Sequence, residues 1–232
     1  MPLLWPSAAL IALVVILFLA ERRYRDAISR LEENFLALLL AVITIVSFTQ
    51  VVARYGFNTG WTGALELTRI LFAWMILFGM SYGVKHGVHL GVDAFTRMTP
   101  RGTFRALAVF GAVATFLYAF LLLYAGWLAL LGADVSTNWR QTGAIGYWRF
   151  MFDRGTGLDD LRYPFWFQEA FGTQDRVQRW IAYLMLPIGL ALLAFRALEG
   201  VVMILRGERE QIIAGHEAED LVAEAQRAEA KE

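Results

Sequence analysis

Two pairs of opposite charges lie inside apolar sequence. Glu66 and Arg69 are three residues apart near the start of the run Ala64–Val84, and Arg196 and Glu199 repeat the spacing in reversed order. Residues three apart share one face of a helix. Charges in hydrocarbon cost about 2.5–3.5 kcal/mol each and therefore usually face protein and are paired. The spacing favours a structural role, although contact with a partner subunit or a transported solute stays open.

The histidines and acidic residues do not form a convincing metal or haem site. The chain has three histidines, at positions 86, 89 and 216. His86 and His89 are too close on one helix to take opposite faces of a haem. A two-histidine metal site would need further ligands, and only Asp93 lies near in sequence. The absence of cysteine excludes thiolate ligands and cysteine nucleophiles. We expect neither enzymatic activity nor a cofactor of the chain's own.

Long apolar runs position these charges. The 232 residues are 58% hydrophobic, and the apolar residues gather in runs of roughly 20, the length that crosses a bilayer. Four spans are predicted, at Phe35–Ala53, Ala64–Val84, Phe104–Leu131 and Trp180–Leu205. The lipid bilayer is therefore the first partner. The formal net charge is zero, which does not favour a nucleic-acid partner.

Local patterns within the spans predict packing details. Arg54 ends a polar stripe on the first span and lies within reach of Glu66 across a short loop. Pro187 and Gly189 are expected to bend the fourth span. Small residues at helical spacing on the third span allow close approach of another helix, from this chain or from a second chain. These small residues are Ala108, Gly111, Ala112, Thr115 and Ala119.

A fifth apolar run, residues 3–20, lacks the basic start and the small-residue cleavage site of a signal peptide. Four arginines follow it, within residues 21–34. This pattern predicts an uncleaved helix with its N-terminus outside the cytoplasm, and a helix lying along the interface is the alternative. The positive-inside rule then places residues 21–34, 85–103 and the C-terminus in the cytoplasm.

The fold class that follows is an all-α integral membrane protein. It has four core transmembrane helices, an additional N-terminal hydrophobic helix, and interfacial helices in the aromatic-rich segment 132–179. That segment is either a lid at the membrane surface or a docking surface for a partner outside the membrane. The predicted divisions are 1–30, an N-terminal helix with a basic linker; 31–205, the membrane domain; and 206–232, a charged cytoplasmic tail.

The runs QVVARYGFNTGW and ELTRILFAWMILFGMSYGVKHGVHLGVD resemble the small membrane subunit of tripartite ATP-independent periplasmic (TRAP) transporters, the DctQ-like family. The matching residues are Arg54 followed by an aromatic, Trp61, Glu66 and Arg69 in an E-L-x-R pattern, Gly79, and His89 followed by Asp93. The resemblance covers residues 31–131, and the fourth span fits in hydropathy only. The N-terminal run and the enlarged 132–179 segment resemble the longer members, those of dicarboxylate-type systems.

The resemblance implies a non-catalytic scaffold subunit of a sodium-coupled importer of organic acids such as C4-dicarboxylates, in the bacterial inner membrane. Its partners would be a large multi-spanning permease subunit, which holds the substrate and sodium sites, and a periplasmic substrate-binding protein. The polar residues would be structural or would contact a partner: Arg54, Trp61, Glu66, Arg69, His89, Asp93, Arg196 and Glu199. The alternative function is the membrane anchor of a respiratory, cytochrome b-type complex.

Overall fold

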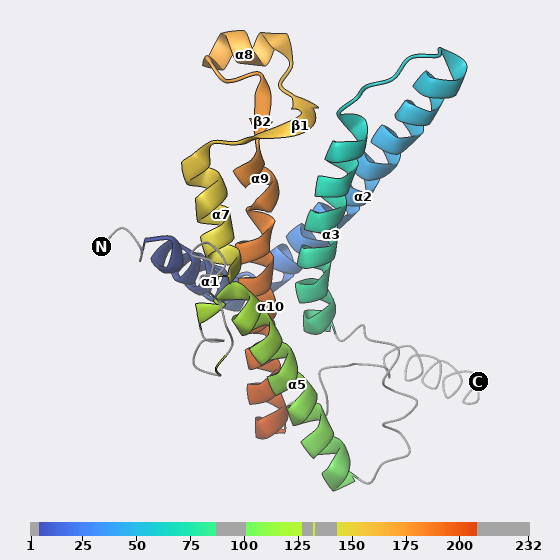
Figure 1. Ribbon diagram of the computed structural model, residues 1–232. Coiled ribbons are helices and arrows are strands. Elements are labelled where there is room, and N and C mark those ends of the chain that lie inside the picture. The colour runs from blue at the N-terminus through green and yellow to red at the C-terminus, as the bar shows by residue number, and fades with distance from the viewer. Residues whose placement is uncertain (1–4, 87–100, 127–131, 133–142, 208–232) are drawn as a thin grey trace, which may run out of the picture. The chain divides into compact units, whose positions relative to one another are not determined.

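The computed structural model describes residues 5–86, 101–126, 132 and 143–207 (Figure 1). The helices and strands, in chain order, are α1 (Trp5–Arg23), α2 (Arg25–Gly56), α3 (Ala64–His86), α5 (Arg101–Leu123), α7 (Gly143–Arg154), β1 (Gly157–Arg162), α8 (Phe165–Phe171), β2 (Arg176–Gln178), α9 (Arg179–Tyr183) and α10 (Met185–Arg206). Five stretches of helix in the described part are long and apolar enough to cross a membrane. They are the four predicted spans, with shifted ends, and α1.

The chain folds as two compact units. The first comprises Met1–Gly79 with Ala119–Leu192, and the second comprises Met80–Tyr118 with Leu193–Glu232. The first unit contains α1, α2 and every described element between α7 and α9. Helices α3, α5 and α10 each begin in one unit and end in the other.

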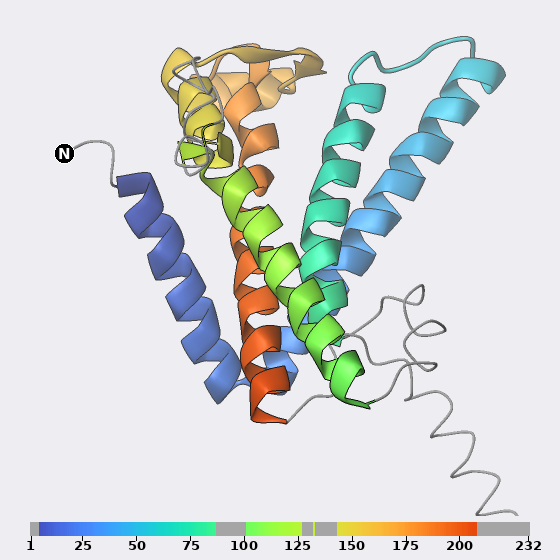
Figure 2. The same cartoon turned by 60° about the horizontal axis from the view of Figure 1, so that its bottom comes forward.

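In the first unit, α2 and α3 form an antiparallel pair joined by the loop 57–63 (Figure 2). The rings of Phe35 and Phe78 meet edge to face at 5.1 Å between centroids. At the loop end of the pair, the backbone N–H of Trp61 donates to Oε1 of Gln50 at 3.1 Å. The polar stripe predicted on the first span thus supplies a fixed partner for the loop.

The fourth span consists of α9 and α10, which are divided at Leu184, three residues before Pro187; the predicted bend at Pro187 and Gly189 stays a prediction. Pro187 lacks an N–H, and its ring crowds the carbonyl four residues earlier, at Tyr183, where α9 ends. The carbonyl oxygen of Ala182, next to the break, accepts a hydrogen bond of 3.1 Å from the indole of Trp74 on α3. Beyond the break, a Cβ added at Gly189 would lie 2.8 Å from Cβ of Leu77, so α10 and α3 approach closely there.

In the second unit, an arginine closes the C-terminal end of α10. The guanidinium of Arg105, on α5, donates to the carbonyl oxygens of Ile204 at 3.0 Å and Leu205 at 2.7 Å. The last carbonyls of a helix have no partner within it, and a cation is favourable at that end. The small-residue stripe on α5 is only partly packed: Ala112 is fully buried, whereas a Cβ at Gly111 would meet nothing within 4 Å.

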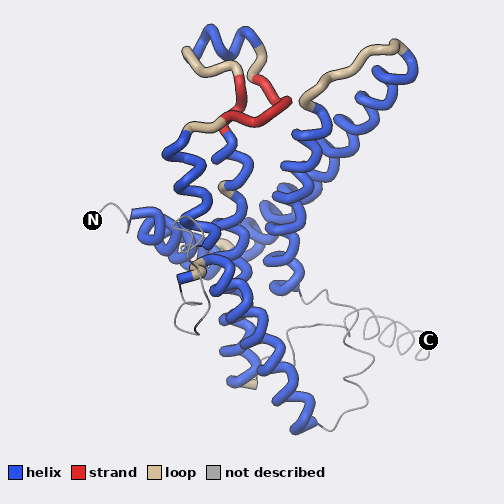
Figure 3. The backbone as a smooth tube through the Cα atoms, in the orientation of Figure 1, coloured by secondary structure: helices blue, strands red, loops and turns tan. Residues whose placement is uncertain are grey.

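Two predicted features differ from the structure. The segment 132–179 contains the predicted helices, α7 and α8, but also an antiparallel two-stranded sheet of β1 and β2, which we did not predict (Figure 3). The third span was expected to continue to Leu131; α5 ends at Leu123, and residues 127–131 lie outside the described residues. A Cβ added at Gly143, with φ +62°, would lie 2.6 and 2.8 Å from the carbonyl oxygens of Leu122 and Leu123, so the backbone at the start of α7 approaches the end of α5 closely.

The contrast between Gly189 and Gly111 gives a prediction. Gly189→Ala should lower the melting temperature of the full chain in detergent, because overpacking costs about 1–3 kcal/mol. Gly111→Ala, also within a helix but in open space, should leave it unchanged or raise it, since alanine is favoured over glycine by about 1 kcal/mol in a helix. Tryptophan fluorescence during heating measures both. Equal shifts for the two variants would contradict the close approach at Gly189.

Candidate functional site

The carboxylate of Glu66 is held by three consecutive backbone N–H groups of β1. The N–H of Asp159 donates to Oε1 at 3.2 Å, and those of Asp160 and Leu161 donate to Oε2 at 2.8 and 2.7 Å. Glu66 lies in the first turn of α3 and is half-buried. Hydrogen bonds to a charged acceptor are roughly twice as strong as neutral ones. We call this arrangement, Glu66 with the amides of residues 159–161, the carboxylate clasp.

Local backbone geometry makes the clasp possible. The register of the β1–β2 pair shifts between Gly157 and Arg162, and the three amides in that stretch point to Glu66. The start of α3 comes close to β1 at Gly63, where an added Cβ would lie 3.1 Å from the carbonyl oxygen of Asp160 and 3.1 Å from Cδ1 of Leu161. A side chain at the entry to α3 would therefore be tightly packed against β1, and glycine avoids that contact.

Further polar contacts attach the strands to α7 and α9. The backbone N–H of Arg179 donates to the carbonyl of Thr156 at 2.8 Å. Its guanidinium pairs with Asp159 at 3.0 Å, but the Asp159 side chain is 76% exposed, so this ion pair adds little. Nearby, the rings of Tyr147 and Tyr183 meet at 5.0 Å. Burial and the hydrogen bond with Tyr183 raise the pKa of the Tyr147 hydroxyl.

The helix between the two strands carries exposed aromatic side chains. Phe165, Trp166 and Phe171 of α8 are 66–78% exposed. An ion pair between Arg162 and Asp175 joins the two ends of the segment that contains α8. Within that segment, Nε2 of Gln168 donates to the carbonyl of Tyr163 at 2.7 Å. Figure 1 shows α8 beyond the two strands, on the side away from α7 and α9. The structure agrees with either predicted role of this segment, a lid at the membrane surface or a docking surface.

The predicted pairing of Glu66 with Arg54 or Arg69 is wrong. Both arginines are exposed, and the described part of the chain shows no hydrogen bond or ion pair from either guanidinium. The physical reason is that backbone amides already satisfy the carboxylate. Glu66 has its partners within its own chain.

The structure gives a different result for each of the other predicted residues. Arg196 and Glu199 form the ion pair that their spacing predicts, at 3.0 Å, with the Arg196 side chain 6% exposed. Trp61 is held through its backbone and keeps its ring about half exposed. His89 and Asp93 lie outside the described residues. Within the described residues, no group of three metal-ligating side chains is present.

The clasp is suited to holding two parts of the chain together. Each carboxylate oxygen accepts at least one hydrogen bond from a fixed backbone donor, so a solute cation would have to displace part of this shell. Sequence reasoning identified Glu66 but missed its partners, because backbone amides leave no side-chain pattern. The only local signal was the glycine-punctuated stretch RGTGLDDLR, which indicates a turn followed by a short strand.

Comparisons with known proteins agree on one family. A family model for the DctQ component of tripartite ATP-independent periplasmic transporters matches residues 43–207, which include both sides of the clasp. The chain is 35% identical to the C4-dicarboxylate TRAP transporter small permease protein DctQ of Vibrio cholerae, over 82% of this chain and 78% of that protein. It is 31% identical to the protein of the same name from Pseudomonas aeruginosa, over 83% and 90%. The Rhodobacter capsulatus protein of that name is 28% identical over 74% and 75%.

The clasp can be tested directly. Glu66→Gln replaces one acceptor oxygen by an NH₂ group and removes the charge, which should cost on the order of 2–3 kcal/mol of local stability. Hydrogen–deuterium exchange at the amides of residues 159–161 should then accelerate about 30- to 160-fold. Glu169→Gln, an exposed change on α8, is the matched control and should leave that exchange unaltered. Unchanged protection in Glu66→Gln would show that the clasp does not hold the strand.

Proposed function

Because the chain belongs to the DctQ component family of tripartite ATP-independent periplasmic transporters, we propose that it is the small permease subunit of a system that imports C4-dicarboxylates or similar organic acids. Three relatives that match along most of the chain carry C4-dicarboxylate in their names. The import would be coupled to sodium. The sodium and solute sites would lie on a large permease subunit, and a periplasmic binding protein would deliver the solute.

The role we propose for this chain is that of a fixed, non-catalytic scaffold. The observation that carries it is the carboxylate clasp, which commits the acidic group at the start of α3 to the chain's own backbone. Two further arginines are used in the same way: Arg196 pairs with Glu199, and Arg105 binds the end of α10. Groups bound to fixed partners hold helices together, whereas a transport site must release its ligand in each cycle.

Arg54 and Arg69 are the candidates for contact with the large permease. They lie on the paired helices α2 and α3, in the last turn of one and the second turn of the other, and both are exposed. A guanidinium at the edge of hydrocarbon needs a carboxylate, carbonyl or phosphate partner. A groove formed by α2 and the loop 57–63, lined by Thr49, Gln50 and Trp61 among others, offers further polar groups.

The charges also support an orientation in the bacterial inner membrane. Arg22 and Arg23 at the end of α1 would hold that end in the cytoplasm. The N-terminus and the segment with the clasp would then face the periplasm, and the C-terminus would be cytoplasmic. This places the exposed aromatic residues of α8 on the side where the binding protein works.

The proposed contact predicts the effect of removing a cation. When the tagged chain is co-expressed with the large permease of its own system and purified in mild detergent, the permease should co-purify with it at one-to-one stoichiometry. Arg69→Gln should reduce that recovery several-fold, because the cation would no longer have its partner. Arg176→Gln, which removes an exposed arginine on β2, is the control. Full recovery with both Arg54→Gln and Arg69→Gln would exclude these residues from the contact.

A scaffold role also predicts how Glu66→Gln affects transport. Uptake should fall with the membrane level of the two subunits, because the clasp supports assembly, while the solute concentration at half-maximal uptake stays close to that of the wild type. The measurement is uptake against concentration, with both subunits quantified. Normal assembly with a large rise in the half-saturating concentration would mean that Glu66 acts on the solute.

The orientation predicts the behaviour of reporter fusions. A reporter that is active only in the periplasm should be active when it is fused at the N-terminus and silent when it is fused after Arg206. A cytoplasmic reporter should give the opposite pattern. A silent periplasmic reporter at the N-terminus, with an active cytoplasmic one there, would indicate that α1 does not span.

A further inference from the structure

Helix α8 exposes three aromatic side chains that take no part in the carboxylate clasp. Phe165, Trp166 and Phe171 are 78%, 67% and 66% exposed. The ring of Phe167 meets that of Trp166 edge to face at 5.6 Å between centroids and lies 4.6 Å from that of Phe171. Two of the three exposed rings therefore belong to one aromatic cluster. Glu169 is the only charged residue of the helix.

The strands on either side of α8 are attached at the starts of two membrane spans. The amides of residues 159–161 in β1 bind Glu66 in the first turn of α3. Strand β2 ends at Gln178, directly before the candidate span Arg179–Arg206. Figure 2 shows both strands and α8 at the same end of the first unit as the loop 57–63. These attachments hold the segment at the depth where the spans leave the hydrocarbon.

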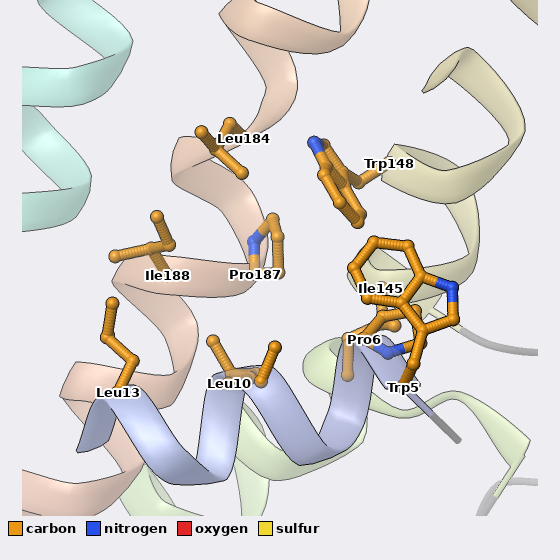
Figure 4. A pocket seen from close by; sticks show the side chains of 10 residues that line it. Trp5, Pro6, Leu10, Leu13, Ile145, Trp148, Leu184, Pro187 and Ile188 are labelled. Carbon is orange, nitrogen blue, oxygen red and sulfur yellow. The ribbon is translucent and has the colours of Figure 1, made fainter. Parts of the chain in front are cut away.

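Two more exposed tryptophans of the first unit lie towards this end. Trp5, in the first turn of α1, is 48% exposed, and Trp61, three residues before α3, is 46% exposed. The ring of Trp5 is held by Trp148 of α7, edge to face at 6.0 Å, beside an apolar pocket (Figure 4). Tryptophan is enriched at the membrane–water interface, where its ring lies at the headgroup level. Trp166 therefore extends a set of interfacial tryptophans.

A bilayer surface provides the surroundings that α8 requires. At the headgroup level, aromatic rings lie against the upper part of the chains while polar groups stay hydrated. This suits a helix with three exposed rings and one carboxylate. With seven residues, α8 is about 10 Å long and cannot cross the hydrocarbon. We propose that α8 is a membrane-surface anchor, whose three exposed rings insert among phospholipid headgroups.

The depth of the segment distinguishes a lipid surface from a protein partner. A docking face for a soluble protein belongs beyond the headgroups, whereas the clasp holds β1 at the first turn of α3. The anchor would give the connection between β1 and β2 an attachment that is independent of the clasp. It concerns how the chain sits in the membrane and does not depend on what the transporter carries.

The test uses the absence of cysteine from the chain, because one engineered cysteine then carries a fluorescent label at a known position. Ala170→Cys labels an exposed position of α8, and Phe48→Cys labels a 69% exposed position inside the α2 span. The full chain is placed in nanodiscs of dioleoylphosphatidylcholine that contain a phospholipid with a nitroxide quencher. The headgroup nitroxide should quench the label on α8 several-fold more than a mid-chain nitroxide does, and the order should be reversed for α2.

The exposed rings should account for this depth. Phe165→Ser combined with Trp166→Ser, in the Ala170→Cys chain, should reduce quenching by the headgroup nitroxide several-fold and increase quenching by iodide in the water. Arg176→Gln, an exposed change on β2, is the matched control and should alter neither. Melting curves confirm that each variant is folded, and Phe171→Ser replaces the double change if the latter unfolds.

Two outcomes would overturn the proposal. Quenching of the label on α8 by iodide alone, or lipid quenching that the serine changes leave unaltered, would show that the rings do not enter the bilayer. The experiment is repeated with the large permease and the periplasmic binding protein of the same system, and lipid quenching should persist. Loss of both lipid and iodide quenching when either protein is added would assign the aromatic face to that protein.

Discussion

A carboxylate at the start of an apolar helix needs donors that remain beside it, and this requirement organises the first unit of the protein. Three backbone amides of β1 meet it for Glu66. These amides are 93–95 residues away in sequence, so the clasp closes a long loop within the unit. Because β1 pairs with β2, and β2 leads directly into α9, the clasp links the start of α3 to the start of the fourth span.

The same principle recurs at two other places among the described helices. Arg105 binds the terminal carbonyls of α10, and Trp74 binds the carbonyl of Ala182 beside the helix break. In each case a side chain satisfies backbone groups that a helix end or a proline leaves without partners. Such bonds cannot be released without exposing backbone to hydrocarbon, which costs several kcal/mol per group by general estimates (about 2–7). The polar groups therefore stiffen the fold.

The sequence predicts those parts of the fold that depend on local pattern. Hydropathy locates the spans, and the three-residue spacing of Arg196 and Glu199 predicts their ion pair, both of which the structure contains. Pro187 lies three residues beyond the division of the last span at Leu184. It does not predict the two strands or the partners of Glu66. Spacing on one helix suggested Arg69 as the partner, but the actual donors are backbone groups far along the chain. Their side chains, two aspartates and a leucine, give no indication that their amides bind a carboxylate.

Because the donors of the clasp are backbone groups, the clasp restricts the residue type at some of its positions and not at others. The side chains of Asp159 and Asp160 are exposed and do not enter the clasp. Almost any residue can take their place and still offer an N–H, whereas proline cannot. Glu66 has no such freedom, because its acceptor must reach β1 from a fixed turn of α3 and must carry charge. A side chain at Gly63 would also be tight, because its Cβ would lie 3.1 Å from the carbonyl oxygen of Asp160 and from Cδ1 of Leu161. The specificity of the clasp is therefore concentrated at the start of α3, although most of its hydrogen-bonding groups lie on the strand.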